Sequence, residues 1–420
     1  MRIERPLYLK RLIQRQNNGM AKVITGIRRC GKSYLLFNLF QEHLLKSGVP
    51  ADHIIGVDLD GIENAGLRDA RALYDHIKAL LPGNGTDQPI YVFIDEIQYV
   101  DAFADVVNGL MRLPGVDVYI TGSNSRFLST DVLTEFRGRG DEVRVRPLSF
   151  SEYLPAHGGT EQEAWEDYYT FGGMPLVLAQ ADDVAKMDYL GNLFSTVYLR
   201  DICDRYSLRH VDELDALVDV LASATGSLTN PHRLENTFRS VQGSSVTDKT
   251  LAAYIDHLED AFLIEGARQY DVRGRRHIGS PRKYYFTDVG LRNARLGFRE
   301  QDENHIMENV IYNELRVRGY SVDVGVVDVL EPDGRGGRAR KRLEIDFVCR
   351  RGNDQCYIQS AFELPTAEKE HQERRSLVRV GDSFRKYVIV GSSIKCKRDA
   401  DGIVTMGLLD FLLDDKSLER

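Results

Sequence analysis

The stretch with the clearest chemistry is 26–33, which reads Gly-Ile-Arg-Arg-Cys-Gly-Lys-Ser and fits the pattern G-x-x-x-x-G-K-[ST] of phosphate-binding loops. A β-branched run precedes it at 21–25, and apolar residues at helical spacing follow at 34–40. A strand that turns into a helix in this way points backbone N–H groups and the positive end of the helix dipole at one spot. The sequence therefore predicts a binding site for a triphosphate.

Each position of this loop has an expected role. Gly26 and Gly31 allow backbone angles and a close approach that a Cβ would block. We expect Lys32 to reach the β- and γ-phosphates of ATP and the Ser33 hydroxyl to bind Mg²⁺. Cys30 is either a tolerated residue at a variable position or an oxidation-sensitive switch. The further expected nucleotide contacts are Ile27, Arg28, Arg29, Cys30 and Tyr34.

Two carboxylates, Asp95 and Glu96, end the apolar run that begins at residue 89. A carboxylate at the end of a buried strand is costly unless a cation such as Mg²⁺ neutralises it. We expect Asp95 to hold the metal, directly or through water. We expect Glu96 to accept a proton from the water that attacks the γ-phosphate. The alternative is that both are ordinary polar residues closing a strand.

Further candidates follow the next apolar run, 116–121. Ser123 or Asn124 would lie near the γ-phosphate as a sensor, unless this segment is simply a turn rich in turn-forming residues. Arg137 and Arg139 come on the loop after it. An arginine there could reach the γ-phosphate of a neighbouring subunit as an arginine finger, and a solvated basic loop is the alternative.

Short apolar strands alternate with helices through this part of the chain, which predicts an α/β fold with a parallel sheet. The expected strands are 21–25, 54–59, 89–96 and 116–121, and the expected helices lie within 1–20 and at 65–81.

The order of several motifs resembles that of a large prokaryotic group of AAA-type ATPases related to archaeal and STAND-type ATPases. The resemblance implies a P-loop NTPase fold and Mg²⁺-dependent hydrolysis of ATP. It also favours Arg139 over Arg137, since Arg139 matches the arginine that the family places before its P-L-S-F-x-E segment. The motifs are G-I-R-R-C-G-K-S, Y-V-F-I-D-E-I-Q, Y-I-T-G-S-N-S, F-R-G-R-G, R-P-L-S-F-S-E-Y-L, F-G-G-M-P, R-K-Y-Y-F-T-D-V-G-L-R-N, E-N-V-I-Y-N-E-L and E-I-D-F-V.

At 420 residues the chain is too long for one ordinary core, so we expect several domains. Apolar residues at helical spacing follow the first part, and then come a helix, a strand, a basic turn and a strand, which describe a winged helix. The predicted domains are a P-loop ATPase core at 1–160, a helical lid at 161–225, a winged helix at 226–295 and a restriction-endonuclease-like α/β domain at 296–420.

Two basic stretches stand out on a chain of net charge −8. Because the overall charge is unfavourable, any binding of DNA has to come from local patches. Basic side chains supply affinity for phosphates without reading sequence, although a solvated hairpin turn or a solubilising loop tip would have the same composition. The candidate nucleic-acid contacts are Arg273, Arg275, Arg276, Arg338, Arg340 and Lys341.

The last predicted domain resembles the PD-(D/E)xK nucleases, such as Holliday-junction resolvases. The resemblance rests on a helix-borne Glu308 and on Asp346 in a strand, followed by a short hairpin. Where the nuclease pattern needs E-x-K, the chain has Gln359-Ser360-Ala361. A neutral amide binds Mg²⁺ weakly, and alanine offers no amine to activate water. We therefore expect a catalytically degenerate domain that serves as a docking or nucleic-acid-binding platform.

Bulk properties describe a globular protein, with 42% hydrophobic and 28% charged residues. The five cysteines are scattered without a C-x-x-C pair, which favours a reducing compartment and argues against a zinc site. The first residues lack the apolar core of a signal peptide, and no uncharged apolar run reaches the length of a membrane span. We expect a cytoplasmic protein that binds no membrane.

Together these features predict a Mg²⁺-dependent ATPase that couples turnover to the binding or remodelling of DNA. Two alternatives stay open: an ATP-driven switch or scaffold that docks a protein partner, and an ATP-regulated nuclease. An arginine finger acting between subunits would require a homo-oligomer.

Overall fold

The computed structural model describes residues 1–82, 88–123, 136, 138–208, 210–242, 246–299, 302–332 and 338–419. The chain forms two compact units, one of Met1–Pro147 with Asp260–Phe262 and the other of Leu148–Glu259 with Leu263–Arg420. Among the helices in these described ranges, none combines the length and the apolar character needed to cross a membrane.

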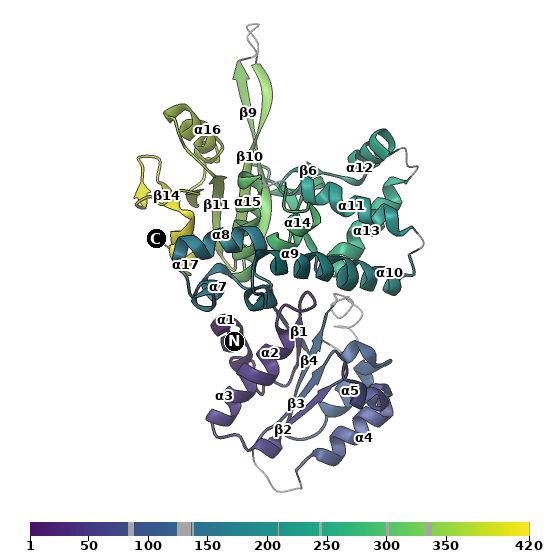
Figure 1. The fold of residues 1–420 in the computed structure, drawn as a ribbon. Helices are drawn as coiled ribbons and strands as arrows, with labels where there is room; N and C mark the ends of the chain where they lie inside the picture. Colours follow the sequence, from purple (N-terminus) through teal and green to yellow (C-terminus); the bar gives the residue numbers. More distant parts are fainter. Residues whose placement is uncertain are drawn as a thin grey trace. The chain divides into compact units, whose positions relative to one another are not determined.

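The first unit is built on a five-stranded parallel sheet in the order β2-β3-β4-β1-β5. Figure 1 shows α2 and α3 on one side of this sheet and α4 and α5 on the other. The carboxyl ends of β1, β3 and β4 meet at one edge of the sheet, because all strands run in the same direction. The elements are α1 (Pro6–Ile13), β1 (Ala21–Thr25), α2 (Lys32–Tyr34), η1 (Leu35–Phe40), α3 (Gln41–Lys46), β2 (Ile54–Asp58), α4 (Ala70–Leu80), β3 (Ile90–Asp95), α5 (Phe103–Leu110), β4 (Val116–Gly122) and β5 (Gly140–Arg144).

The four strands predicted from apolar runs are confirmed. Every residue of β1 and β3 is buried, as expected for parallel strands covered by helices on both faces. The helix predicted at 65–81 begins later, at Ala70, where Asp69 caps it by accepting a hydrogen bond from the Ala72 N–H. The edge strand β5 was not predicted, since its sequence, Gly-Asp-Glu-Val-Arg, has a single apolar side chain.

The second unit begins with helices, and the range 161–225 is helical as expected, whereas its role as a lid domain stays a prediction. Two helices of the second unit start with a reciprocal capping box, one made by Ser149 with Glu152 and the other by Thr160 with Glu163. The helices are α7 (Phe150–His157), α8 (Glu161–Phe171), α9 (Asp183–Asn192), α10 (Arg200–Tyr206), α11 (Val211–Ser223), α12 (Pro231–Thr237), α13 (Asp248–Asp260), α14 (Val289–Arg295), α15 (Glu303–Val317), α16 (Ala367–Val378) and α17 (Leu408–Leu413).

A nine-stranded sheet in the order β13-β14-β12-β11-β10-β9-β7-β8-β6 forms the rest of this unit. The β7–β8 hairpin has the predicted strand–basic turn–strand form, and β7 pairs in parallel with β9. Strands from both sides of the predicted boundary at 295 thus share one sheet, and the winged helix and nuclease-like domain stay predictions. The strands are β6 (Leu228–Thr229), β7 (Ile264–Asp271), β8 (Arg276–Phe286), β9 (Ser321–Pro332), β10 (Arg338–Arg351), β11 (Asp354–Ala361), β12 (Arg385–Val390), β13 (Lys397–Arg398) and β14 (Ile403–Gly407).

A buried carboxylate, Asp288, caps α14 and is expected to make stability depend on pH. Its oxygens accept hydrogen bonds from the Gly173 N–H at 2.7 Å and the Leu291 N–H at 3.1 Å, and burial raises its pKa to about 6. The folded chain therefore holds a proton between about pH 4 and 6 that the unfolded chain has lost. This group should lower the free energy of unfolding, as pH rises through that window, by roughly 2–3 kcal/mol.

Urea unfolding of the wild type and of Asp288→Asn at pH 4.5 and pH 6.5 tests this expectation. The asparagine side chain of the variant cannot titrate. The free energy of unfolding of the wild type should therefore fall relative to that of the variant when the pH is raised from 4.5 to 6.5. A difference that stays constant would contradict the raised pKa of Asp288.

Candidate nucleotide-binding site

The loop after β1 has the backbone that its glycines predict. Gly26 has φ +143° and Gly31 has φ +97°, both in a region that favours glycine. A Cβ on Gly26 would lie 2.0 Å from the Val145 carbonyl oxygen, so no other residue fits there without moving the chain. Arg29 also has a positive φ, +66°, although it carries a side chain. Such conformations cost energy and cluster at functional sites.

The Lys32 side chain is buried and points back over the loop. Its ammonium group donates hydrogen bonds to the carbonyl oxygens of Gly26 at 3.1 Å and Ile27 at 3.3 Å. This contact holds a positive charge beside the turn that precedes the continuous helical run α2–η1–α3. The arrangement suits the role predicted for Lys32, in which its ammonium group binds the terminal phosphates of a nucleotide.

The acid pair lies beside this loop, as the topology requires. The Thr121 hydroxyl of β4 donates to the Asp95 carboxylate on β3, and the Ser33 hydroxyl of the loop is close enough to favour the charged form of that carboxylate and so to lower its pKa. Burial raises the pKa of Asp95 above its ordinary value, and the nearby Glu96 and Asp58 carboxylates add to the rise. Ser33 and Asp95, the two predicted Mg²⁺ ligands, are thereby brought together. A divalent cation between them would stabilise the charged form of Asp95 and supply charge neutralisation for phosphates.

Glu96 follows in a left-handed conformation with φ +50°. Its N–H donates to the Thr121 hydroxyl at 2.9 Å, and its carboxylate accepts a hydrogen bond from the Gln98 amide. Thr121 therefore holds both members of the acid pair, because its hydroxyl donates to Asp95 while it accepts from Glu96. Neither Thr121 nor Gln98 was predicted as a site residue, although both lie inside the quoted motifs Y-I-T-G-S-N-S and Y-V-F-I-D-E-I-Q.

A third unpredicted residue, Arg5, hydrogen bonds to the backbone of the phosphate loop. Its guanidinium donates to the carbonyl oxygens of Cys30 at 3.1 Å and Arg146 at 2.7 Å, and it is buried. The Cys30 thiol is buried as well, and this burial raises its pKa. A buried neutral thiol reacts slowly with oxidants, so Cys30 fits the role of a tolerated packing residue. Nothing in the sequence alone marks Arg5, because its partners lie far along the chain.

The other residues predicted to contact the nucleotide or to sense its γ-phosphate differ in burial and in their neighbours. Ile27 is buried, Arg28 lies 4.0 Å from the Asp60 carboxylate, and Tyr34 is half-buried at the end of α2. Ser123 is buried at the end of β4, close to the acid pair through Gln98 at 3.4 Å. Asn124, the predicted sensor, lies outside the described residues.

Arg139 is exposed and lies at the opposite edge of the sheet from the phosphate loop. Its carbonyl oxygen accepts from the Ala21 N–H at 2.8 Å, next to the first residue of β1, whereas the loop follows the last residue of that strand. Five residues of extended strand, spanning roughly 13–16 Å, separate the two ends. Arg139 therefore does not meet Lys32 or Glu96 within one chain, and a finger role would need a second copy. Arg137 lies outside the described residues.

A second charged cluster lies in the other unit, around the Lys283 ammonium group on β8. It contacts Glu308 of α15 at 2.8 Å, Glu344 of β10 at 2.7 Å and Asp346 of β10 at 3.6 Å. The Tyr285 hydroxyl also donates to Glu308, at 2.6 Å. Burial and the neighbouring Glu308 raise the pKa of Asp346 well above its ordinary value.

The sequence has alanine at position 361, where the nuclease pattern needs a lysine. In the folded chain the Lys283 ammonium group comes to Asp346 from a different hairpin, at 3.6 Å. The side-chain amide of Gln359 donates a hydrogen bond to the Glu373 carboxylate of α16, at 3.3 Å. Within the described ranges, no group of three or more His, Cys, Asp or Glu side chains is placed to hold a metal ion.

Several of the residues predicted to contact nucleic acid already form hydrogen bonds or ion pairs within the chain. Arg273 donates to the carbonyl oxygens of Asp328 and Arg379, and Arg276 lies 3.7 Å from the Asp271 carboxylate. Arg340 pairs with Asp328, and Lys341 lies 3.9 Å from Glu331. Arg275 is exposed in the turn between β7 and β8 with φ +51°. The Arg338 side chain is not described.

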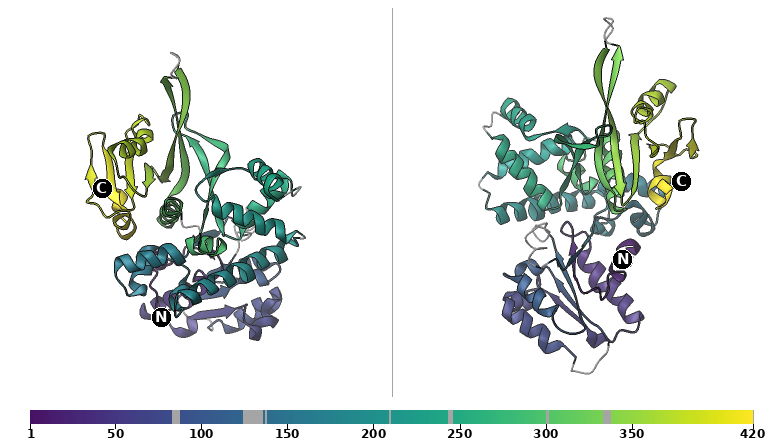
Figure 2. Two further views of the ribbon diagram at one scale, coloured as in Figure 1. Left: turned by 45° about the horizontal axis from the view of Figure 1, so that its top comes forward. Right: turned by 180° about the vertical axis from the view of Figure 1, so that it is seen from behind.

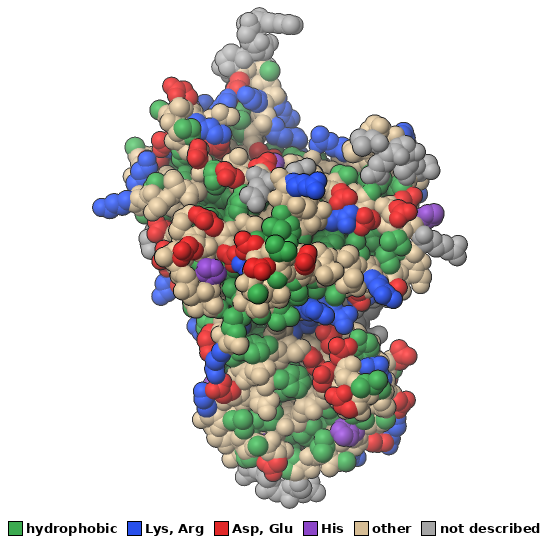
Figure 3. Space-filling view, in the orientation of Figure 1, with side chains coloured by type: hydrophobic (Ala, Val, Ile, Leu, Met, Phe, Trp, Pro, Cys, Tyr) green, Lys and Arg blue, Asp and Glu red, His purple; other side chains and the backbone are tan. Residues whose placement is uncertain are grey.

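The long β9–β10 hairpin carries several of these residues. Figure 2 shows it extending beyond the other strands of the nine-stranded sheet, and Lys and Arg side chains gather over it in Figure 3. Arg342 also lies 3.6 Å from Asp328, so two arginines share one aspartate there. Near the end of the described hairpin, three cationic side chains, Arg340, Lys341 and Arg342, thus face two carboxylates, Asp328 and Glu331.

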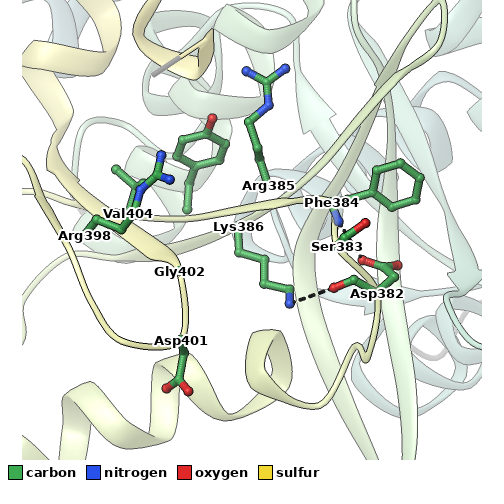
Figure 4. Close-up of a pocket in the computed structure, with 10 residues that line it drawn as sticks. Asp382, Ser383, Phe384, Arg385, Lys386, Arg398, Asp401, Gly402 and Val404 are labelled. Carbon is green, nitrogen blue, oxygen red and sulfur yellow. Dashed lines mark hydrogen bonds between the residues drawn. The ribbon is translucent and has the colours of Figure 1, made fainter.

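A pocket of about 270 Å³ lies at the amino ends of β12 and β14, between Lys386, Arg398 and Asp401 (Figure 4). The Lys386 ammonium group donates to the Asp382 carbonyl oxygen at 3.2 Å, at the wall of this pocket. Ligands of open α/β sheets bind at the carboxyl ends of strands, so this pocket is not our candidate site.

Comparison with known proteins identifies the relatives of this chain. Residues 18–154 match the model of a family described as an AAA domain, and residues 162–302 match a domain of unknown function, DUF8612. An uncharacterized protein of Haemophilus influenzae is 34% identical over 416 residues, which cover 98% of each chain. The chain belongs to the same family as this relative and carries an AAA domain. An uncharacterized protein of Methanocaldococcus jannaschii, MJ1544, is 26% identical over 363 residues, which cover 84% of this chain and 76% of the relative.

Solved structures show weaker similarity to this chain. Cdc6p of Pyrobaculum aerophilum is 12% identical with a TM-score of 0.30, covering 61% of this chain and 86% of its own. A DNA polymerase III gamma subunit-related protein of Thermotoga maritima is 13% identical with a TM-score of 0.30, covering 60% and 99%.

Proposed function

We propose that this protein hydrolyses ATP with Mg²⁺ and couples turnover to the binding or remodelling of DNA. The placement of Asp95 beside the phosphate loop is the observation that carries the ATPase part, because the Ser33 hydroxyl of the loop favours the charged form of this carboxylate while Thr121 on β4 donates to it. Lys32 would bind the terminal phosphates, Ser33 and Asp95 would hold Mg²⁺, and Glu96 would accept the proton of the attacking water. Magnesium would neutralise the charge that develops on the phosphates.

The DNA part rests on local positive charge. The exposed Arg275 in the β7–β8 turn and the basic side chains of the β9–β10 hairpin would contact phosphates. Such contacts release counterions, so the affinity should fall steeply with salt. A homo-oligomer would be needed for Arg139 to reach a γ-phosphate.

The experiment compares the ATPase rate of the full chain without DNA and with single-stranded, duplex and four-way-junction DNA. We expect DNA to raise the rate and the labelled DNA to dissociate as salt increases. Arg275→Ala should weaken DNA binding, while the matched variant Lys46→Ala, on α3, should leave it unchanged. An ATPase rate that none of the three DNAs changes would favour the second function, an ATP-driven switch that docks a protein.

We further propose that the nuclease-like part does not cut DNA, because the Lys283 ammonium group already lies among the three carboxyl groups that a divalent cation would need. The DNA in the same assay should therefore stay intact with Mg²⁺ or Mn²⁺. Nicking that is lost in both Asp346→Ala and Lys283→Met would overturn this proposal. It would assign Lys283 the part of the missing E-x-K lysine.

A further inference from the structure

We propose that Gln98 is a positioning residue, which holds the Glu96 carboxylate in place for the attack of water on ATP. This inference rests on the ATPase function proposed above. Gln98 lies in the short turn Ile97–Tyr99, two residues beyond Glu96. Its amide nitrogen donates to Glu96 Oε2 and lies 3.4 Å from the Ser123 hydroxyl at the end of β4.

The cost of this placement points to a role other than folding. Gln98 Oε1 is buried and has no hydrogen-bond partner among the described residues. An unpaired buried acceptor costs about 1–3 kcal/mol, so an apolar side chain of the same length would serve the core better. Glu96 itself is held at φ +50°, which is unfavourable for a residue with a side chain. Two unfavourable features at neighbouring positions are typical of a site arranged for chemistry.

The chemistry explains what the contact would achieve. In hydrolysis the water oxygen forms a bond to the γ-phosphorus, and the bond to the β,γ-bridging oxygen breaks, with its electron pair leaving on ADP. One proton of the water passes to the carboxylate of Glu96. A free glutamate rotates about several bonds, whereas a carboxylate held through Oε2 by Gln98 presents Oε1 in one direction. The amide remains a donor at every pH and cannot take the proton itself.

The contact with Ser123 connects this arrangement to the next strand. Ser123 is buried at the end of β4, and Thr121 on the same strand holds Asp95 and the Glu96 N–H. The backbone of Glu96 is therefore fixed by Thr121, and its carboxylate by Gln98. Both supports come from residues that need not touch ATP.

The test is Gln98→Met, which keeps the length of the side chain and removes both its donor and its unpaired acceptor. We expect kcat to fall on the order of tenfold or more, with KM for ATP changed less than about twofold. The thermal midpoint should stay equal or rise, because the unpaired acceptor is gone. Gln98→Glu, which places a second carboxylate against Glu96, should lower kcat at least as far.

The matched control is Gln162→Met, since the exposed Gln162 donates to Glu166 at 2.7 Å in the same kind of Gln–Glu contact. It should leave kcat and KM unchanged. If the wild type turns over ATP and Gln98→Met does so at a similar rate, this inference alone is overturned. A Gln98→Met protein whose thermal midpoint drops together with its ATP affinity would show a structural role and overturn it too. A wild type that never turns over ATP would remove the proposed function as well.

Discussion

Glu96→Gln should bind ATP as the wild type does and turn it over roughly 10²–10⁴-fold more slowly. The substitution keeps the size of the side chain and leaves Lys32, Ser33 and Asp95 unchanged, so phosphates and Mg²⁺ should still bind. The amide cannot accept the proton of the attacking water. Phosphate release gives the rate, and titration with a fluorescent ATP analogue gives the affinity.

The matched control for this variant is Glu63→Gln, on an exposed segment of the same unit. It should retain both the rate and the affinity of the wild type. If Glu96→Gln releases phosphate at the wild-type rate, Glu96 is not the base. If it loses affinity for ATP instead, its main contribution is to the structure of the site.

Lys32→Ala is expected to lose most of the affinity for ATP. A charge-assisted hydrogen bond contributes about 1.5–3 kcal/mol, which corresponds to a loss of roughly 10–150-fold in affinity. The variant also removes the ammonium group that the Gly26 and Ile27 carbonyl oxygens accept from, so the loop loses its internal support. Equilibrium titration with the same ATP analogue measures the change.

Lys46→Ala is the control for Lys32→Ala, because Lys46 is exposed on α3 and pairs only with Glu42 at the surface among its described contacts. Its affinity for ATP should match that of the wild type. Circular dichroism melts of both variants separate a loss of binding from a loss of fold. A Lys32→Ala protein that keeps its fold and binds ATP at the wild-type affinity would contradict the role of the loop.

The first unit was largely predictable because its signals are local. The phosphate loop depends on two glycines and a lysine within eight residues, and the strands on either side are continuous apolar runs that fit a parallel sheet. The acid pair was predictable for the same reason, since parallel strands bring their carboxyl ends to one edge. Thr121 and Gln98 lie within these local motifs, but their contacts depend on side-chain directions that spacing does not reveal.

Contacts between distant segments were not predictable. Arg5 reaches Cys30 and Arg146, and Lys283 reaches Asp346, only after the chain has folded. No periodicity or composition marks an arginine or a lysine for a buried partner of this kind. Lys283 is an example. The nuclease pattern places a lysine at position 361, where this chain has alanine, and the amine next to Asp346 comes instead from Lys283 on a different hairpin. The edge strand β5 was missed because it has a single apolar residue, and charged side chains of this kind are common on edge strands.

The most direct measurement is a crystal structure of Glu96→Gln with Mg²⁺ and ATP, a variant expected to hold its nucleotide unhydrolysed. We expect the γ-phosphate within about 3 Å of the Lys32 ammonium nitrogen, with Mg²⁺ on the Ser33 hydroxyl and Asp95 directly or through a water. A nucleotide bound anywhere else on the chain, or a loop at residues 26–33 that admits none, would contradict the ATPase site.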